Sequence, residues 1–241
     1  RHLIQAGCTR LVLTDRNGEQ CKDAAQALSV GGVAAHFLHC DMADLPAVQA
    51  LIGQAEGLVG PVNALVNCAG NTDRGSILDT RPATWDAIFD VNAKGPFFLL
   101  QAFANRLIAL ELPGGAVNIL SFVPHGGAPI LAPYGASKSA LLYITKNSAH
   151  TLAPHRIRVN GINVGWMDTP GEHVTQMAAH GRPANWRDGV EAKLPFGMML
   201  KPDHVAAQVA LFLSPQSGVV TGSIMDYDQQ VIGIYPDTDK Q

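Results

Sequence analysis

The sequence lacks an excess of positive charge and lacks any long apolar run. It contains 17 lysines and arginines against 20 aspartates and glutamates, for a formal net charge of −3. A protein that neutralises nucleic-acid phosphates needs a basic face, so this balance argues against a nucleic-acid partner. The longest stretch nearly free of charge, residues 112–137, carries four prolines and five glycines. Such a stretch cannot form a membrane-spanning helix, so we expect no membrane partner either.

Cysteine is also scarce, and its spacing shows no metal or disulfide motif. The four cysteines form no CxxC pair and no cluster with histidine. We therefore expect reduced thiols, a cytoplasmic location and no metal site. A starting methionine is missing, and the helical pattern of the first residues already ends at Gly7. A native chain seldom begins inside a helix, so we expect an N-terminal piece to precede Arg1.

What the sequence does contain is an alternation of short apolar runs with longer amphipathic segments. Composition and length predict buried strands at residues 11–14, 33–40, 64–67, 116–120 and 158–163, with a last strand near Ile224. Apolar spacing and end signals predict helices at residues 18–30, 45–58, 80–110, 133–152 and about 203–213. Parallel strands need such crossover helices, so the alternation predicts a mainly parallel sheet covered on both faces.

No Ser/Gly/Pro-rich linker and no internal repeat divides the 241 residues. We therefore predict a single α/β domain over residues 1–241, a Rossmann-like, doubly wound parallel sheet in three layers. Residues 166–193 have no clear periodicity. Ligands in such folds bind beyond the carboxyl ends of the strands, so we expect this segment to form a substrate lid.

Tyr134 and Lys138 are the first candidates for chemistry. They lie four residues apart near the start of a helix that Pro133 can initiate, so both side chains share one helix face. A phenol with a pKa near about 10 exchanges protons poorly at neutral pH. An ammonium about 4 Å away contributes roughly 4 kcal/mol, which lowers the pKa of the phenol by about three units. Taken alone, however, the pair also fits two exposed residues on a helix surface.

Five stretches together make the pattern specific. They are Asn-Cys-Ala-Gly at 67–70, Val-Asn-Ala-Lys-Gly-Pro-Phe at 91–97, Val-Asn-Ile-Leu-Ser at 117–121, Tyr-Gly-Ala-Ser-Lys at 134–138 and Arg-Val-Asn at 158–160. In this order and at this spacing, with Ser121 thirteen residues before Tyr134, the sequence resembles the short-chain dehydrogenase/reductase family over nearly its whole length. The resemblance implies an NAD(P)-dependent oxidoreductase that moves a hydride between the cofactor and a carbonyl or alcohol carbon.

The resemblance implies a role for each of four catalytic residues. Tyr134 would be the general acid in reduction and the base in oxidation, and Lys138 would lower its pKa and bind the nicotinamide ribose. Ser121 would hold the substrate oxygen where charge develops. Asn92 would hold a water that links Lys138 to solvent. The alternatives are a strand-end hydroxyl for Ser121 and a local helix kink for Asn92.

The resemblance also places the cofactor. Asp15 ends the strand that carries the ribose-reading residue, where a carboxylate accepts from the 2′-hydroxyl and repels a 2′-phosphate, so we expect NAD rather than NADP. Arg16 follows it and tolerates a phosphate. Asp41 would contact adenine or, alternatively, cap the helix that begins at 45. The other expected cofactor contacts are Met42, Asn67, Ala69, Gly70, Tyr134, Lys138, Gly165, Met167 and Thr169. The first strand and the Gly-rich phosphate turn are expected before Arg1.

The substrate is the least defined element of the site. His125 and Trp166 are the candidates to contact it, and such polar and aromatic groups suit a polyol or a sugar-like ligand. A solvated histidine is the alternative for His125. An isomerase or lyase with bound NAD and a non-catalytic cofactor-binding regulator remain alternatives for the whole chain. Members of the resembled family are commonly homotetramers, and we expect the same here.

Overall fold

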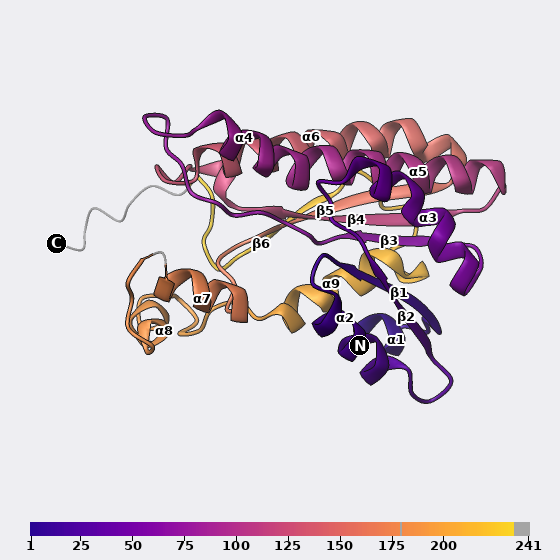
Figure 1. Cartoon of the computed structure of the whole chain (residues 1–241), viewed down its shortest axis with the longest axis horizontal. Coiled ribbons are helices and arrows are strands. Elements are labelled where there is room, and N and C mark those ends of the chain that lie inside the picture. The colour runs from indigo at the N-terminus through magenta and orange to yellow at the C-terminus, as the bar shows by residue number, and fades with distance from the viewer. Residues whose placement is uncertain (179, 234–241) are drawn as a thin grey trace.

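A four-stranded parallel sheet forms the centre of the molecule (Figure 1). The computed structural model describes residues 1–178 and 180–233. The sheet has the order β3-β4-β5-β6, made of β3 (Ala64–Asn67), β4 (Gly114–Ser121), β5 (Ile157–Val164) and β6 (Ile224–Tyr227). The register pairs Ser121 with Val164, so β4 and β5 end side by side. Because all neighbours are parallel, their carboxyl ends meet at one edge.

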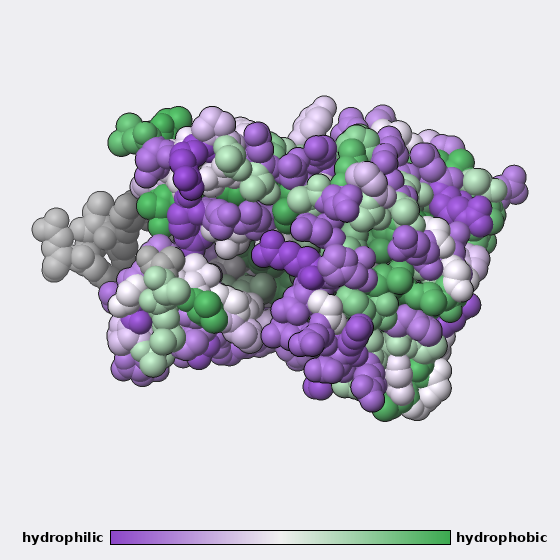
Figure 2. Space-filling model, viewed as in Figure 1, coloured by the Kyte–Doolittle hydropathy of each residue, from purple (hydrophilic) through white to green (hydrophobic). Residues whose placement is uncertain are grey.

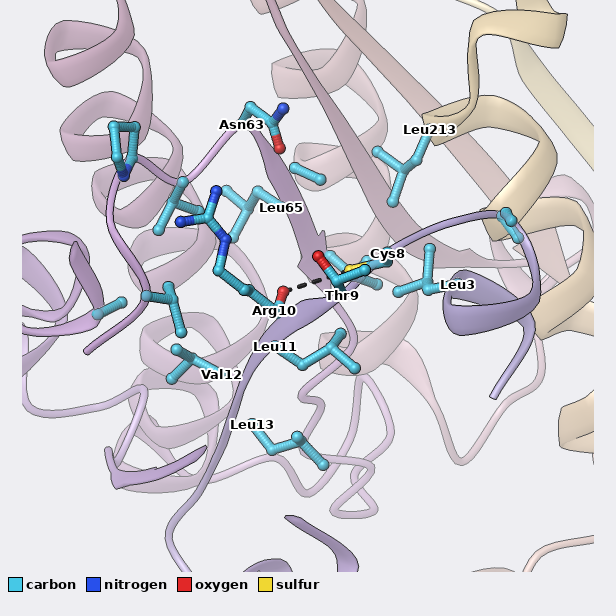
Figure 3. Close-up of a pocket in the computed structure, with 18 of the residues that line it drawn as sticks. Leu3, Cys8, Thr9, Arg10, Leu11, Val12, Leu13, Asn63, Leu65 and Leu213 are labelled. Carbon is cyan, nitrogen blue, oxygen red and sulfur yellow. Dashed lines mark hydrogen bonds between the residues drawn. The ribbon is translucent and has the colours of Figure 1, made fainter. Parts of the chain in front are cut away.

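A second, two-stranded parallel sheet pairs β1 (Arg10–Asp15) with β2 (Ala34–His39). Between β1 and β3 lies a cavity of about 550 Å³, lined along one side by residues 10–14 and along the other by residues 63–66 (Figure 3). Its other walls are mainly aliphatic side chains, including Leu51, Ile52 and Leu213. The strand expected before Arg1 would fit between these two edges, and that strand stays a prediction.

Helices cover both faces of the central sheet, as the alternation predicts (Figure 1). One face carries α3 (Leu45–Val59), α5 (Gly95–Ala109) and α6 (Ala132–Leu152), and the other carries α9 (Pro202–Leu213). Successive residues of β4 point to opposite faces: Ala116 packs with α5, and Val117 packs with α9. Burial of each large side chain in these two cores contributes roughly 1.5–3 kcal/mol. The α/β, Rossmann-like fold is therefore confirmed.

The shorter elements complete the described chain. They are α1 (His2–Gln5), α2 (Gly18–Leu28), α4 (Pro82–Phe89), α7 (Pro170–Ala178), α8 (Trp186–Glu191), the π-turn η1 (Asp90–Lys94), and the 3₁₀ turns η2 (Val123–His125), η3 (Ala153–His155) and η4 (Pro215–Ser217). Within the described ranges, no helix has both the length and the apolar character that a membrane crossing requires.

The single helix predicted over residues 80–110 is present from Pro82 to Ala109, but one of its turns is wider than an α-helical turn. The structure assigns it as α4, the π-turn η1 and α5, which follow one another without a break. Pro96, in the first turn of α5, has no N–H to donate, and its ring crowds the carbonyl one turn earlier. A wider turn relieves that crowding, and such π-turns often mark functional sites. This turn contains Asn92.

The segment at residues 166–193, whose sequence shows no clear periodicity, contains two short helices. These are α7 and α8, both too short to impose a clear period on the sequence. Figure 1 shows it beside the carboxyl end of the sheet, and Figure 2 shows the surface hollowed between it and the rest of the molecule. Asp168 anchors it, since its carboxylate lies 2.6 Å from Arg187 Nε and 2.7 Å from Lys201 Nζ.

Candidate active site

The strand ends bring the predicted site residues to one edge of the fold. Asp15 ends β1, Asn67 ends β3 and Ser121 ends β4. Tyr134 and Lys138 lie in the first turns of α6, which passes this edge. The site is therefore distinct from the cavity between β1 and β3, which none of the four predicted catalytic residues lines.

Asn92 is fully buried and fastens two elements of the site together. Its Oδ1 accepts from Asn71 N at 2.7 Å, and its Nδ2 donates to Asn71 O at 2.9 Å and to Ser137 Oγ at 3.0 Å. The π-turn directs this side chain inward, between the loop after β3 and the start of α6. Asn92 thus aligns the loop that carries Gly70 with the helix that carries Lys138. Its role in a water relay stays a prediction.

Lys138 is a buried ammonium with one protein acceptor. Its side chain donates from Nζ to Ile119 O at 2.8 Å, and the residue is only 4% exposed. Burial lowers the pKa of Lys138 to about 8, because a charge far from water is costly. The ammonium has three N–H donors, so two remain for a ligand.

The expected lowering of the Tyr134 pKa by Lys138 does not appear in the structure. Lys138 Nζ lies 5.9 Å from the centre of the Tyr134 ring and is directed to a backbone carbonyl. Burial raises the pKa of Tyr134, while Ser121 and the positive charge of Arg74 act in the lowering direction and the negative charge of Glu172 acts in the raising direction. The sequence argument assumed a short separation and ignored desolvation, which is the larger effect here.

Ser121 is buried at the end of β4, beside Tyr134. Its Oγ accepts from Val123 N at 3.2 Å, which fixes the turn η2 to the strand end. The hydroxyl hydrogen of Ser121 can still be donated to a ligand oxygen. The hydroxyl of Ser121 acts on the Tyr134 phenol, so the two groups are neighbours. Their shared contact with a substrate atom stays a prediction.

The two predicted substrate residues lie near this site, but protein groups engage both. His125 Nε2 lies 3.0 Å from Asp226 Oδ1 and 2.9 Å from Asn163 Nδ2. Trp166 donates from Nε1 to Glu172 Oε1 at 2.8 Å and stacks on Trp186 with ring centres 5.5 Å apart. Their contact with substrate stays a prediction.

Two of the residues predicted to contact the adenosine are carboxylates, and each accepts a hydrogen bond from the backbone two residues later. Asp15 Oδ1 accepts from Asn17 N at 2.7 Å, and Asp41 Oδ1 accepts from Ala43 N at 2.9 Å. The alternative that Asp41 caps α3 is wrong, because Asp44 is the N-cap and accepts from Ala47 N at 3.3 Å. In each aspartate the second carboxylate oxygen takes no part in these bonds. Arg16 directly follows β1, and Met42 lies in the turn after β2.

The residues predicted to contact the nicotinamide lie in the segment after β5. Gly165 packs so closely on Asp228 that an added Cβ would lie 2.4 Å from its carboxyl carbon. Met167 pairs with Leu200, and Thr169 Oγ1 accepts from Glu172 N at 3.0 Å at the start of α7. These residues connect the catalytic edge to the 166–193 segment.

The described residues fit a nicotinamide dinucleotide on two observations. Lys138 is buried with donors to spare, which a ribose diol can use. Asn67 Oδ1 is buried and has no hydrogen-bond partner among the residues described, while Asn67 Nδ2 donates to Asn118 Oδ1 at 2.8 Å. Ala69 and Gly70 follow it as exposed backbone of low bulk between these groups. Asn67, Ala69, Gly70 and Lys138 are the residues that would hold the central part of the cofactor.

Sequence reasoning missed several residues of this edge. Arg74 affects the Tyr134 phenol from the loop after β3, and Trp186 packs in the 166–193 segment with Trp166 and His173. The sequence also shows no sign of the ion pairs that Asp168 forms and that hold the segment. No periodic pattern marks such residues, because their roles depend on contacts between distant loops.

Comparison with known proteins identifies the family. The family model described as "Enoyl-(Acyl carrier protein) reductase" matches residues 1–229. The (3R)-3-hydroxyacyl-CoA dehydrogenase of Rattus norvegicus is 33% identical over 187 residues, which cover 77% of this chain and 70% of the relative.

Solved structures agree in fold. A gluconate 5-dehydrogenase from Burkholderia cenocepacia J2315 in complex with NADP and tartrate has a TM-score of 0.81 and 29% identity, covering 95% of this chain and 88% of the other. An NAD⁺-bound xylitol dehydrogenase has a TM-score of 0.84 and 25% identity, covering 95% and 91%. These proteins carry different substrate names and different nicotinamide nucleotides, so the comparisons identify a class of enzyme rather than a substrate.

Proposed function

The chain belongs to the short-chain dehydrogenase/reductase family and is an oxidoreductase, and we propose that it uses NAD to interconvert a secondary alcohol and a ketone. One observation carries the proposal: the Ser121 hydroxyl at the end of β4 acts on the Tyr134 phenol of α6, and the buried Lys138 Nζ lies 5.9 Å from the centre of the Tyr134 ring. A binding module has no chemical need for a buried charge beside a phenol and a hydroxyl.

In the proposed mechanism the side chains position the substrate oxygen and move a proton. Bound NAD supplies the hydride acceptor for alcohol oxidation, and its reduced form supplies the donor for ketone reduction. Ser121 donates its hydroxyl hydrogen to the substrate oxygen and stabilises the charge that develops there. Tyr134 gives its proton to that oxygen in reduction and accepts it in oxidation.

The raised pKa of Tyr134 sets the pH dependence of the two directions. The phenol is protonated at neutral pH and ready to act as an acid in reduction. Oxidation needs the phenolate, so its rate should increase with pH until Tyr134 is ionised. We propose that the free N–H groups of Lys138 Nζ face the cofactor and the Tyr134 phenol during turnover. The positive charge of Lys138 then favours the phenolate.

Asp15 supports NAD as the cofactor. A carboxylate at the end of β1 accepts from a ribose hydroxyl and repels a 2′-phosphate. Arg16 directly after it is the feature that would tolerate NADP, and solved relatives contain either nucleotide. We therefore propose that the chain uses NAD in preference to NADP and that the charge of Asp15 controls this preference.

The substrate we propose is a polyol or a sugar-like compound. Trp166, at 39% exposure, offers an aromatic face from the 166–193 segment, and His125 offers a polar ring next to η2. Both kinds of group suit a hydroxylated chain, by stacking and by hydrogen bonds. We propose that the 166–193 segment is the lid that covers this substrate.

We also propose a homotetramer in the cytoplasm. Phe97 on α5 is exposed to 39%, and such apolar surface on a long helix suits helix packing between subunits. Four free cysteines support a reducing compartment. Monomeric scattering in solution would contradict the assembly.

The test is turnover of NAD by the purified chain with a panel of polyols, sugars and hydroxy-ketones. Tyr134→Phe should lower kcat by roughly 10²–10⁴-fold with a native circular dichroism spectrum, because it removes the proton donor and little volume. Tyr143→Phe, an exposed tyrosine on the same helix, is the matched control and should keep wild-type turnover. Wild-type kcat in Tyr134→Phe would exclude the mechanism, and turnover without net NADH release would indicate an isomerase or lyase.

A further inference from the structure

The loop that follows β3 is fastened on both sides of Arg74. Asn71 is held by Asn92 through two hydrogen bonds, at 2.7 and 2.9 Å. Gly75 N donates to Ile130 O at 3.0 Å, and Ala132 N donates to Gly75 O at 3.1 Å. Ala132 is the first residue of α6, so this loop lies against the helix turn that presents Tyr134. Arg74 is therefore held at the catalytic edge.

The guanidinium of Arg74 is oriented by a backbone carbonyl and a histidine ring. Nη1 donates to Thr72 O of its own loop, and Nε lies 3.4 Å from His180 Nε2, beyond α7. Over residues 1–178 and 180–233, no carboxylate forms an ion pair with it. A partly buried guanidinium with donors left over suits a planar anion, because its fork matches a carboxylate.

Among the cations of this edge, Arg74 is the one whose charge acts on the Tyr134 phenol, whereas the guanidinium of Arg182 lies over the rings of Trp166 and Trp186. Arg187 and Lys201 are both engaged by Asp168, and Lys138 is directed to Ile119 O. Glu172 accepts from Trp166 Nε1 and Gln176 Nε2. Arg74 and Glu172 thus act on the Tyr134 phenol with opposite charges, and such a field orients an anionic substrate.

We propose that Arg74 is a specificity-determining residue that binds a carboxylate of the substrate. The preferred substrate is then a hydroxy acid with a hydroxylated chain, such as a sugar acid, rather than a neutral polyol. This inference rests on the proposed function, because it names the substrate class of the same site. The carboxylate would lie towards Arg74, and Glu172 would repel the reversed orientation.

Two measurements on the full chain test this role. The first compares kcat/KM for D-gluconate and D-glucitol, which share a six-carbon hydroxylated chain and differ at the terminal carboxylate. The wild type should prefer D-gluconate, and Arg74→Gln should lower kcat/KM for this acid by roughly 10- to 150-fold, mainly through KM, since a charged hydrogen bond is lost. D-glucitol should change less than about 3-fold, because it makes no charged bond.

The second measurement is calorimetric binding of tartrate, which needs no turnover. Tartrate should bind the wild type and lose roughly 10-fold or more in affinity in Arg74→Gln, with partial recovery in Arg74→Lys, which keeps the charge but not the fork. Arg81→Gln, an exposed arginine at the start of α4, is the matched control and should change neither measurement.

The outcomes separate this inference from the proposed function. Equal losses on D-gluconate and D-glucitol, or tartrate binding that is absent or independent of Arg74, would overturn the inference. If tartrate binding depends on Arg74 but no alcohol reduces NAD, the proposed function fails and the anion site stands. If neutral polyols reduce NAD and tartrate does not bind, the proposed function stands and the anion site at Arg74 fails.

Discussion

The buried ammonium of Lys138 should destabilise the folded chain, and replacing it should reveal by how much. The pKa of Lys138 falls from 10.5 to about 8 in the folded, cofactor-free state because the charge is desolvated. Each pKa unit corresponds to about 1.36 kcal/mol, so the buried charge costs about 3 kcal/mol at pH 7. The residue is almost fully buried, and solvent therefore screens little of this cost.

The sign of the pH dependence follows from proton binding. Below pH 8 lysine is charged in both the folded and the unfolded state, and the full cost is present. Between pH 8 and 10.5 the unfolded state binds more protons than the folded state, so the stability of the wild type increases with pH. Above 10.5 both states are neutral and the cost has disappeared.

The experiment compares wild type with Lys138→Met by urea unfolding at several pH values from 7 to 10.5, without cofactor. The free energy of unfolding of the variant minus that of the wild type should decrease by about 3 kcal/mol from pH 7 to pH 10.5, because the wild type loses the cost of its buried charge. The constant loss of the bond to Ile119 O does not affect this difference. Lys146→Met is the matched control: Lys146 is exposed on the same helix and donates to Gly222 O at 3.3 Å. For Lys146→Met this difference in the free energy of unfolding should not change with pH. A difference that is equally independent of pH for Lys138→Met would refute the reasoning.

Two further predictions concern the cofactor and the buried amide. Asp15→Ser should raise the ratio of kcat/KM for NADP to that for NAD by at least about 10-fold, because one carboxylate no longer repels a 2′-phosphate; an unchanged ratio in steady-state assays would assign nucleotide choice elsewhere. Asn92→Ala should lower the free energy of unfolding by roughly 2–3 kcal/mol, because it leaves the buried Asn71 N–H without its acceptor. Urea unfolding measures that loss, and a change below about 0.5 kcal/mol would contradict a fastening role.

Much of the fold could be predicted because its signals are local. The strand at 64–67 is found at the predicted residues, and β4 and β5 extend their predictions by one or two residues at each end. Apolar runs of this length report burial on both faces, which is the requirement of a parallel sheet. The wider turn within the helix at 80–110 could not be predicted, because a π-turn keeps the apolar content of a helix and changes only its hydrogen bonds.

The site could be predicted where spacing along one element sufficed. Tyr134 and Lys138 share a helix face by their spacing of four residues, and Ser121 is placed by the end of its strand. Arg74 could not be found in this way, since its position depends on contacts of its loop with Asn92 and with residues 130–132.

The sequence by itself determined the alternation of strands and helices, the family motifs and the identity of the four catalytic candidates. Only the tertiary structure decided the charge state around them. It buries Lys138 against Ile119 O, raises the pKa of Tyr134 and brings the opposite charges of Arg74 and Glu172 near enough to act on the phenol. The physical reason is that periodicity is a property of one segment, whereas desolvation and Coulomb interactions depend on every group that surrounds an atom.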